Sequence, residues 1–149
     1  MTESTAVIPA LVIRRIYDAP RERVYAAWTD PELAARFLGP GDVRAVEIAM
    51  DVRPGGSYRI VMISPDGSRM PVGGIYREVR PPQRLVMTWR WEEDDPREER
   101  DTLLTLEFLE RDGKTEFILT HELLANLDSR DRHAHGWNLI LDELAVSVR

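Results

Sequence analysis

Few ionisable side chains stand where they could do chemistry, and His121 is the first of them. It ends an alternating stretch and has the parity of Phe117 and Leu119, so its ring is predicted to lie on the inner face of a strand while Glu122 points outward. A histidine at the mouth of an apolar cavity could be a general base, a hydrogen-bonding anchor for a ligand or a structural residue. The structural role is the commonest of the three.

Glu78 is the second candidate, because it has the parity of Gly74 and Tyr76 and is therefore predicted to point inward. An inward carboxylate must be paired, hydrogen-bonded or protonated. A salt bridge to an arginine is the preferred interpretation. The alternative is an enzyme in which Glu78 and His121 act as acid and base on a bound ketone or ester.

Other reaction centres are not recognisable. His133 and His135 resemble a metal pair, but residues two apart in a helix point about 200° from each other, so we expect two separate surface histidines. The chain has no cysteine, which excludes thiolate sites and disulfides. Gly55-Gly56 and Gly73-Gly74 lack the context of a phosphate-binding loop, and no Ser-His-Asp triad or carboxylate pair is identifiable. We therefore predict no catalytic residues, no metal and no cofactor, and an enzyme is less expected than a binding protein.

Composition limits the partners. A chain of 149 residues is expected to form one domain, spanning 1–149. Its net charge of −6 argues against a nucleic-acid partner, which selects positive surfaces. No segment has the pattern of a signal peptide or a membrane span, so we expect a cytoplasmic protein, either a monomer or a homodimer.

The longest helical pattern is Ser129–Arg149. Its apolar residues recur at the spacing of a helix that buries one face; they are Trp137, Ile140, Leu141, Leu144 and Val148. Gly136 precedes this stripe, and a glycine inside a helix is unfavourable. We therefore predict that Gly136 marks a close approach to the sheet or to a ligand, with Trp137 and Leu141 as the main contacts of a pocket.

The N-terminal part predicts an edge strand and two short helices. Leu11–Tyr17 is rich in β-branched residues, and Asp18 could cap a helix with Pro20 in its first turn. Trp28 lies on the apolar face of this helix. A second helix follows Pro31 and directs Phe37 to the core.

From Val43 to His121 the apolar residues alternate instead, which predicts strands. Val46, Ile48 and Met50 alternate with Ala45, Glu47 and Ala49, so they are expected to share one face of the first of these strands. Turn signals separate the strands at 64–67 and 112–113, Gly73-Gly74 marks a bulge or a close approach, and the charged segment 92–101 is expected to be a solvated loop. The order is strand, two helices, six strands and a long helix, so the class is α+β with an antiparallel meander.

Large, mostly amphipathic side chains gather on the predicted inner face. Together they form the expected ligand pocket: Tyr58, Ile60, Met62, Tyr76, Glu78, Met87, Trp89, Phe108, Phe117, His121, Trp137 and Leu141. Such residues provide the apolar area and the few polar groups of a small-molecule site, but they also fill ordinary cores.

Several segments resemble one protein family. They are YDAPRERVYAAWTDP at 17–31, DVRPGGSYR at 51–59, PDG at 65–67, GIYREVRPPQRLVMTW at 74–89, Gly136-Trp137 and Leu141-Asp142. These strings are similar to those of the bacterial homologues of the activator of heat-shock-protein ATPase, within the START-like (SRPBCC, Bet v-like) helix-grip superfamily. One departure is Phe37-Leu38, where the family often has two tryptophans.

The resemblance implies a seven-stranded antiparallel sheet curled around the C-terminal helix, with two small helices closing one end of the groove. Members of the superfamily bind lipids, sterols, polyketides and hormones, and a minority catalyse cyclisation or hydrolysis. Our leading hypothesis is a non-catalytic binder of a small hydrophobic molecule. The alternatives are a module that docks on a chaperone or regulatory protein, and an enzyme of the polyketide cyclase or hydrolase type that uses His121.

Overall fold

The computed structural model describes residues 8–39, 41–92 and 100–149. The strands are β1 Leu11–Tyr17, β2 Arg44–Met50, β3 Ser57–Ile63, β4 Arg69–Arg80, β5 Arg84–Trp91, β6 Thr102–Arg111 and β7 Lys114–Glu122; the helices are α1 Arg21–Thr29, α2 Pro31–Ala34 and α3 Leu127–Ser147. The strands form one seven-stranded sheet in the order β1-β7-β6-β5-β4-β3-β2, with every neighbouring pair antiparallel. The predicted element order, the meander and the edge position of β1 are confirmed.

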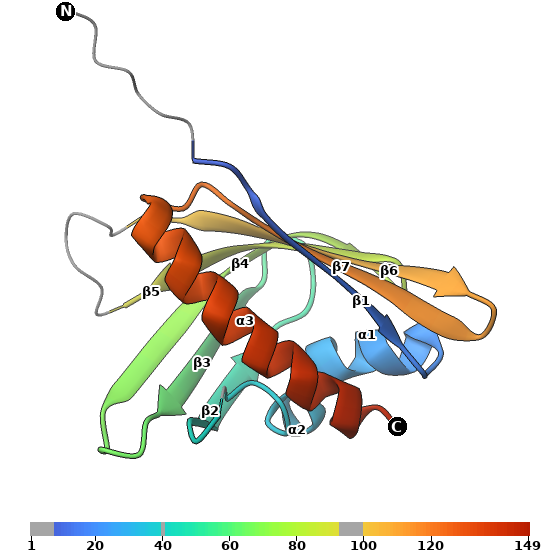
Figure 1. The fold of residues 1–149 in the computed structure, drawn as a ribbon, viewed down its shortest axis with the longest axis horizontal. Helices are drawn as coiled ribbons and strands as arrows, with labels where there is room; N and C mark the ends of the chain where they lie inside the picture. The colour runs from blue at the N-terminus through green and yellow to red at the C-terminus, as the bar shows by residue number, and fades with distance from the viewer. Residues whose placement is uncertain (1–7, 40, 93–99) are drawn as a thin grey trace, which may run out of the picture.

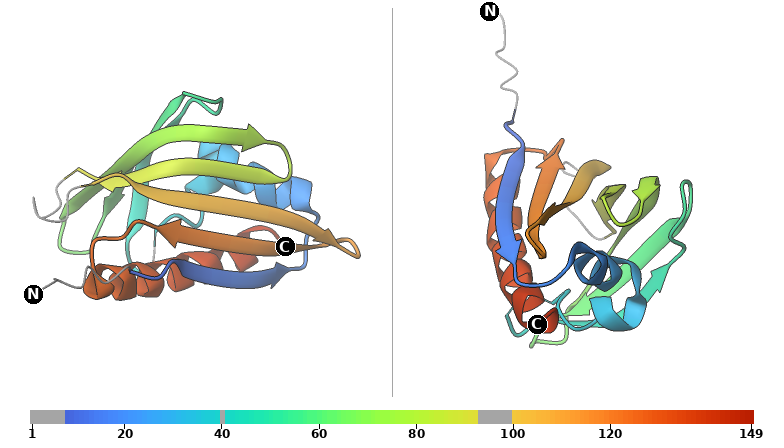
Figure 2. Two further views of the ribbon diagram at one scale, coloured as in Figure 1. Left: turned by 90° about the horizontal axis from the view of Figure 1, so that it is seen from above. Right: turned by 90° about the vertical axis from the view of Figure 1, so that its right-hand side faces the viewer.

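The sheet curls around α3, and the fold is a helix grip (Figures 1 and 2). Helix α3 crosses the inner face obliquely and runs beside β1, where Arg15 bonds Asp142 at 2.7 Å and the Tyr17 hydroxyl donates to the Leu141 carbonyl at 3.0 Å. Helices α1 and α2 lie at the end of the groove near the C-terminus of α3 (Figure 1). This arrangement divides the space under α3 into two regions.

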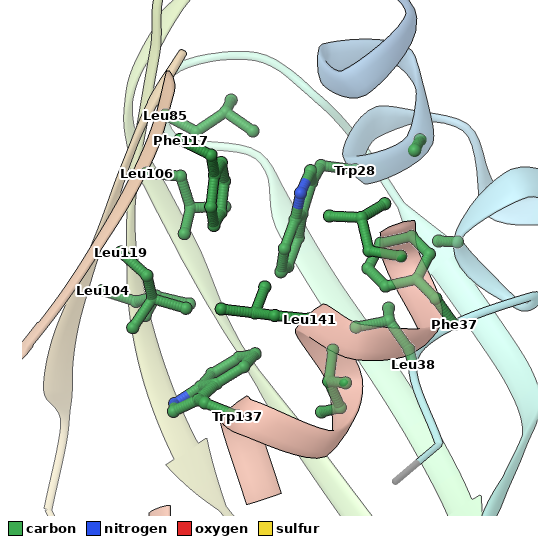
Figure 3. Packing of buried hydrophobic residues seen from close by; sticks show 14 of the residues in the cluster. Trp28, Phe37, Leu38, Leu85, Leu104, Leu106, Phe117, Leu119, Trp137 and Leu141 are labelled. Atoms are coloured by element: carbon green, nitrogen blue, oxygen red, sulfur yellow. The ribbon is translucent and has the colours of Figure 1, made fainter. Parts of the chain in front are cut away.

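Side chains from α1 and from the turn that follows α2 fill the first region. The Trp28 ring stacks on Phe117, with centroids 5.7 Å apart, and meets the edge of Phe37 at 5.0 Å. Phe37 and Leu38 are each 1% exposed, and Leu141 packs against the same group (Figure 3). This end of the groove is therefore a solid core.

The local signals for turns and caps are mostly confirmed. Asp112 and Gly113 adopt φ values of 54° and 81° in the β6–β7 hairpin, and Gly67 has a φ of 89° in the β3–β4 turn. The prediction that Asp18 caps α1 is wrong. Pro20 occupies the N-cap position with an extended ψ of 150°, so the helix begins one residue beyond it. Residues 93–99 of the predicted charged loop lie outside the described residues.

Two irregularities change which side chains face inward. The register of β2 shifts between Ala45 and Glu47, and Val46 is 44% exposed, so its predicted place beside Ile48 is wrong. The register of β4 shifts between Tyr76 and Glu78. An extra residue in one strand reverses the parity beyond it, which explains both corrections.

Glu78 accordingly does not face the core. Its carboxylate lies 3.2 Å from Nε of Arg84 and 3.3 Å from Nη1 of Arg80, and its side chain is 35% exposed. The inward orientation is wrong, and the salt-bridge interpretation is confirmed. Gly74, by contrast, is a close approach as predicted, because a Cβ there would lie 2.1 Å from the Thr88 carbonyl oxygen.

Candidate functional site

A cavity of about 330 Å³ occupies the second region under α3. Its walls are parts of β3, β4 and β5 and the segment of α3 from Arg132 to Ile140, so it lies at the opposite end of the groove from α1 and α2. The residues that line it are Met62, Arg69, Met70, Pro71, Trp89, Trp91, Arg132, His133, Gly136, Trp137 and Ile140.

The helical wall follows from residue spacing. Arg132, His133, Gly136, Trp137 and Ile140 recur every three or four residues, so they form one stripe along α3. The stripe continues as Leu141 and Leu144 into the solid core. The cavity and the core are thus consecutive parts of one helix face.

Trp137 stands at the boundary between these two parts. Its ring centroid lies 6.2 Å from that of Trp28 on the core side and 4.9 Å from that of Trp89 on the cavity side. It is 2% exposed, so it is held by packing on both sides. A molecule in the cavity would meet a rigid aromatic surface there.

Gly136 provides open space beside that surface. A Cβ at this position would meet no heavy atom of the described residues within 4 Å. The predicted close approach of Gly136 to the sheet is therefore wrong, because the glycine borders the cavity instead. Its approach to a ligand stays a proposal.

The strand wall combines thioethers and indoles. Met62 of β3 is paired with Met70 of β4, and Val72 is paired with Trp91 of β5. Trp91 meets the edge of Trp89 with centroids 5.7 Å apart. The buried Trp89 indole N–H has no hydrogen-bond partner among the described residues. Apart from that donor, the hydrogen-bonded Trp91 indole and Arg69 at the start of β4, the described residues of this wall are therefore apolar.

His121 lies behind Trp137, fully buried at 0% exposure. The Trp137 N–H donates to Nδ1 of His121 at 3.0 Å. The Thr102 hydroxyl lies 2.7 Å from Nε2 and donates its own proton to the Trp89 carbonyl at 2.6 Å, so Nε2 must carry the proton of the imidazole. Burial first, and His133 second, lower the pKa of His121 to about 3. The ring is neutral, and both nitrogens are engaged.

His133 was expected on the helix surface, and this prediction is wrong. Its ring packs against His121 with centroids 4.9 Å apart, and its Nε2 accepts a hydrogen bond of 3.0 Å from the Trp91 indole. Its Nδ1 lies 2.8 Å from the Ser129 carbonyl oxygen, which can only accept, so Nδ1 carries a proton. His133 precedes Trp137 by four residues, and that spacing could have revealed its place in the wall. His135 is exposed, as expected.

The predicted pocket residues fall into three groups. Met62, Trp89 and Trp137 line the cavity. Buried elsewhere in the core are Tyr58, Ile60, Tyr76, Met87, Phe108, Phe117, His121 and Leu141. Glu78 lies in surface ion pairs, so the structure does not bring it together with His121.

Lining residues absent from the expected pocket come mainly from the ends of strands and from α3; of these, only Trp91 was placed on the predicted inner face. They are Arg69, Met70, Pro71, Trp91, Arg132, His133 and Ile140. Trp91 has the parity of Trp89, which is a usable signal, whereas nothing in the sequence marks Arg69 or Pro71. No cluster of three or more potential metal ligands occurs within residues 8–39, 41–92 and 100–149. Over the same ranges no helix has the length and apolarity needed to cross a membrane.

A sheet curled around one long helix, with a cavity between them, defines a helix-grip protein. The family model described as Activator of Hsp90 ATPase homolog 1-like protein matches residues 18–149, and the chain belongs to this family. A comparison with curated protein sequences finds no match.

Solved structures of bacterial proteins agree with this assignment. A protein from Chromobacterium violaceum is 27% identical, with a TM-score of 0.85 and coverage of 93% of this chain and 96% of its own. The AHSA1 protein from Silicibacter pomeroyi is 27% identical, with a TM-score of 0.80 and coverage of 93% and 96%. CalU16 from Micromonospora echinospora is 26% identical, with a TM-score of 0.72 and coverage of 96% and 81%.

Proposed function

We propose that this chain binds a small apolar molecule in the cavity under α3 and performs no chemistry on it. The observation that carries the proposal is the cavity itself. Its volume of about 330 Å³ lies within the range of roughly 300–1,000 Å³ found for small-molecule sites. Three of its lining residues are tryptophans, which provide large contact areas at low entropic cost.

The surroundings of His121 support binding without catalysis. A general base needs a free nitrogen within reach of the substrate proton. Both nitrogens of His121 are committed to Thr102 and Trp137, and the pKa near 3 makes the ring a weak base. Glu78, the other candidate, lies in ion pairs with Arg80 and Arg84.

A ligand screen with a blocked variant tests the proposal. Fatty acids, sterols and aromatic polyketides would be examined by thermal shift and native mass spectrometry. A ligand at 100 times its Kd stabilises the folded state by about 2.7 kcal/mol, which corresponds to a rise in Tm of roughly 5–10 °C for a chain of this size.

The variant Gly136→Leu places a side chain in the cavity, whereas His135→Leu adds the same side chain at the exposed neighbouring position. We expect Gly136→Leu to abolish the shift and His135→Leu to preserve it. If no compound in the panel binds, or if Gly136→Leu binds as well as the unmodified chain, the cavity is not a ligand site.

A further inference from the structure

We propose that the ligand is an amphipathic anion, a molecule with one carboxylate and one apolar chain, and that Arg69 and Arg132 receive the carboxylate. This inference rests on the proposed function and specifies its ligand class. It follows from the placement of charge in the cavity wall.

The two arginines come from opposite walls. Arg69 begins β4, and Arg132 lies in the second turn of α3. Both line the cavity and are exposed, with side-chain exposures of 51% and 54%, so they form its solvent-facing rim. A ligand group between sheet and helix could therefore contact a guanidinium on either side.

The charge of the lining is opposite to that of the chain. The whole sequence has 26 acidic and 20 basic residues, a net charge of −6. Among the residues that line the cavity in the described part of the chain there is no carboxylate, whereas there are two arginines and His133. An anionic group entering this site meets no acidic side chain among the described lining residues, and a cationic group would meet two like charges.

The rim arginines already have carboxylate partners, but these are weak competitors. Arg69 lies 3.2 Å from Glu47, and Arg132 lies 3.1 Å from Asp128 four residues earlier. All four side chains are at least half exposed, and such pairs contribute roughly 0–1 kcal/mol. A guanidinium has five N–H donors, and one carboxylate accepts at most two of them in the bidentate geometry. The pairs with Glu47 and Asp128 are thus weak competitors for a ligand carboxylate.

The inner walls define the rest of the molecule. Trp89, Trp137 and Ile140 are each less than 5% exposed and provide aromatic and aliphatic surface. Met62 and Met70 provide flexible thioethers that adapt to an irregular chain. The cavity volume of about 330 Å³ lies near the lower limit for small-molecule sites, which favours a medium-length chain over a sterol skeleton.

Three probes with the same tail separate the contributions of head and tail: decanoate, decanol and decyltrimethylammonium. Isothermal titration calorimetry at low ionic strength would give their affinities. We expect decanoate to bind about tenfold more tightly than decanol, the gain from one hydrogen bond to a charged group, and decyltrimethylammonium to bind most weakly. Added salt should weaken decanoate more than decanol.

The double variant Arg69→Gln/Arg132→Gln should bind decanoate no better than decanol. Arg53→Gln is the matched control, because Arg53 is 67% exposed, is paired with Asp51 at 2.8 Å and lies outside the cavity wall. Equal affinities for decanoate and decanol in the unmodified chain, or a preference that persists in the double variant, would overturn the anionic ligand.

The failure of this inference is distinguishable from that of the proposed function. Equal binding of decanoate and decanol, both blocked by Gly136→Leu, would keep the cavity as a ligand site while rejecting the carboxylate. Absence of binding by every probe and every compound of the screen would reject both.

Discussion

The indole N–H of Trp137 donates a hydrogen bond of 3.0 Å to Nδ1 of His121, and both side chains are buried. The bond joins α3 to β7, and the other nitrogen of His121 joins the same group to Thr102 of β6. Because Trp137 also forms a wall of the cavity, the histidine positions a surface that a ligand would contact. His121 is thus a structural residue of the sheet that supports the site from behind.

The buried His121 should make stability depend on pH. Its pKa is 6.5 as an ordinary histidine and about 3 in the folded chain, so between these values the unfolded state binds more protons than the folded one. Stability from this group is fully present above pH 6.5 and is lost as the pH falls toward 3, with a slope of up to about 1.4 kcal/mol per pH unit.

Urea denaturation between pH 7 and pH 4 measures that slope. The variant His121→Gln can keep the hydrogen bond to Thr102 but does not titrate, so its stability should fall less steeply on acidification. Carboxylates titrate in the same range in both proteins, and the difference between the two slopes isolates the histidine. Identical slopes would mean that the folded histidine is protonated as easily as the unfolded one.

Gly136→Ala should stabilise the free protein by roughly 0.5–1 kcal/mol. Alanine has the higher helix propensity, and its Cβ would meet no described heavy atom within 4 Å. Thermal denaturation without ligand checks this value. A loss of stability would show that the helix backbone at this position does contact the sheet, which the structure contradicts.

Gly74→Ala, by contrast, should destabilise the folded protein. Its Cβ would lie 2.1 Å from the Thr88 carbonyl oxygen and 2.5 Å from the Thr88 hydroxyl, so β4 and β5 would have to separate. Forced overpacking of this kind costs about 1–3 kcal/mol. Chemical denaturation of the two alanine variants side by side gives the comparison, and a neutral effect at Gly74 would mean that the strands are farther apart than described.

Glu78→Gln should change the free energy of unfolding by no more than about 1 kcal/mol, because its partners Arg80 and Arg84 are surface residues. If Glu78 instead faced the core beside a buried arginine, neutralising its carboxylate would lower the free energy of unfolding by about 3–5 kcal/mol. Denaturation at neutral pH therefore distinguishes the surface ion pairs from the inward orientation that strict alternation predicts.

Much of the fold was predictable because its signals are local. The hairpin at Asp112-Gly113 follows from two residues that tolerate positive φ, and the burial of Leu104, Leu106 and Phe108 follows from a period of two. The site was less predictable. Met62, Trp89 and Trp137 were expected at the pocket, but Leu141 on the same helix face lies in the solid core.

The sequence by itself determined the order of the elements, the antiparallel pairing and the face of each regular strand and helix, since periodicity is a property of neighbouring residues. Only the tertiary structure decided which part of the groove is empty. Trp28 of α1 and Phe37 of the turn after α2, both far along the chain from α3, fill one end and leave the other end beside Gly136 open. It also placed Val46 and Glu78 outside the core, because an extra residue in a strand reverses its parity without a marked change in local composition.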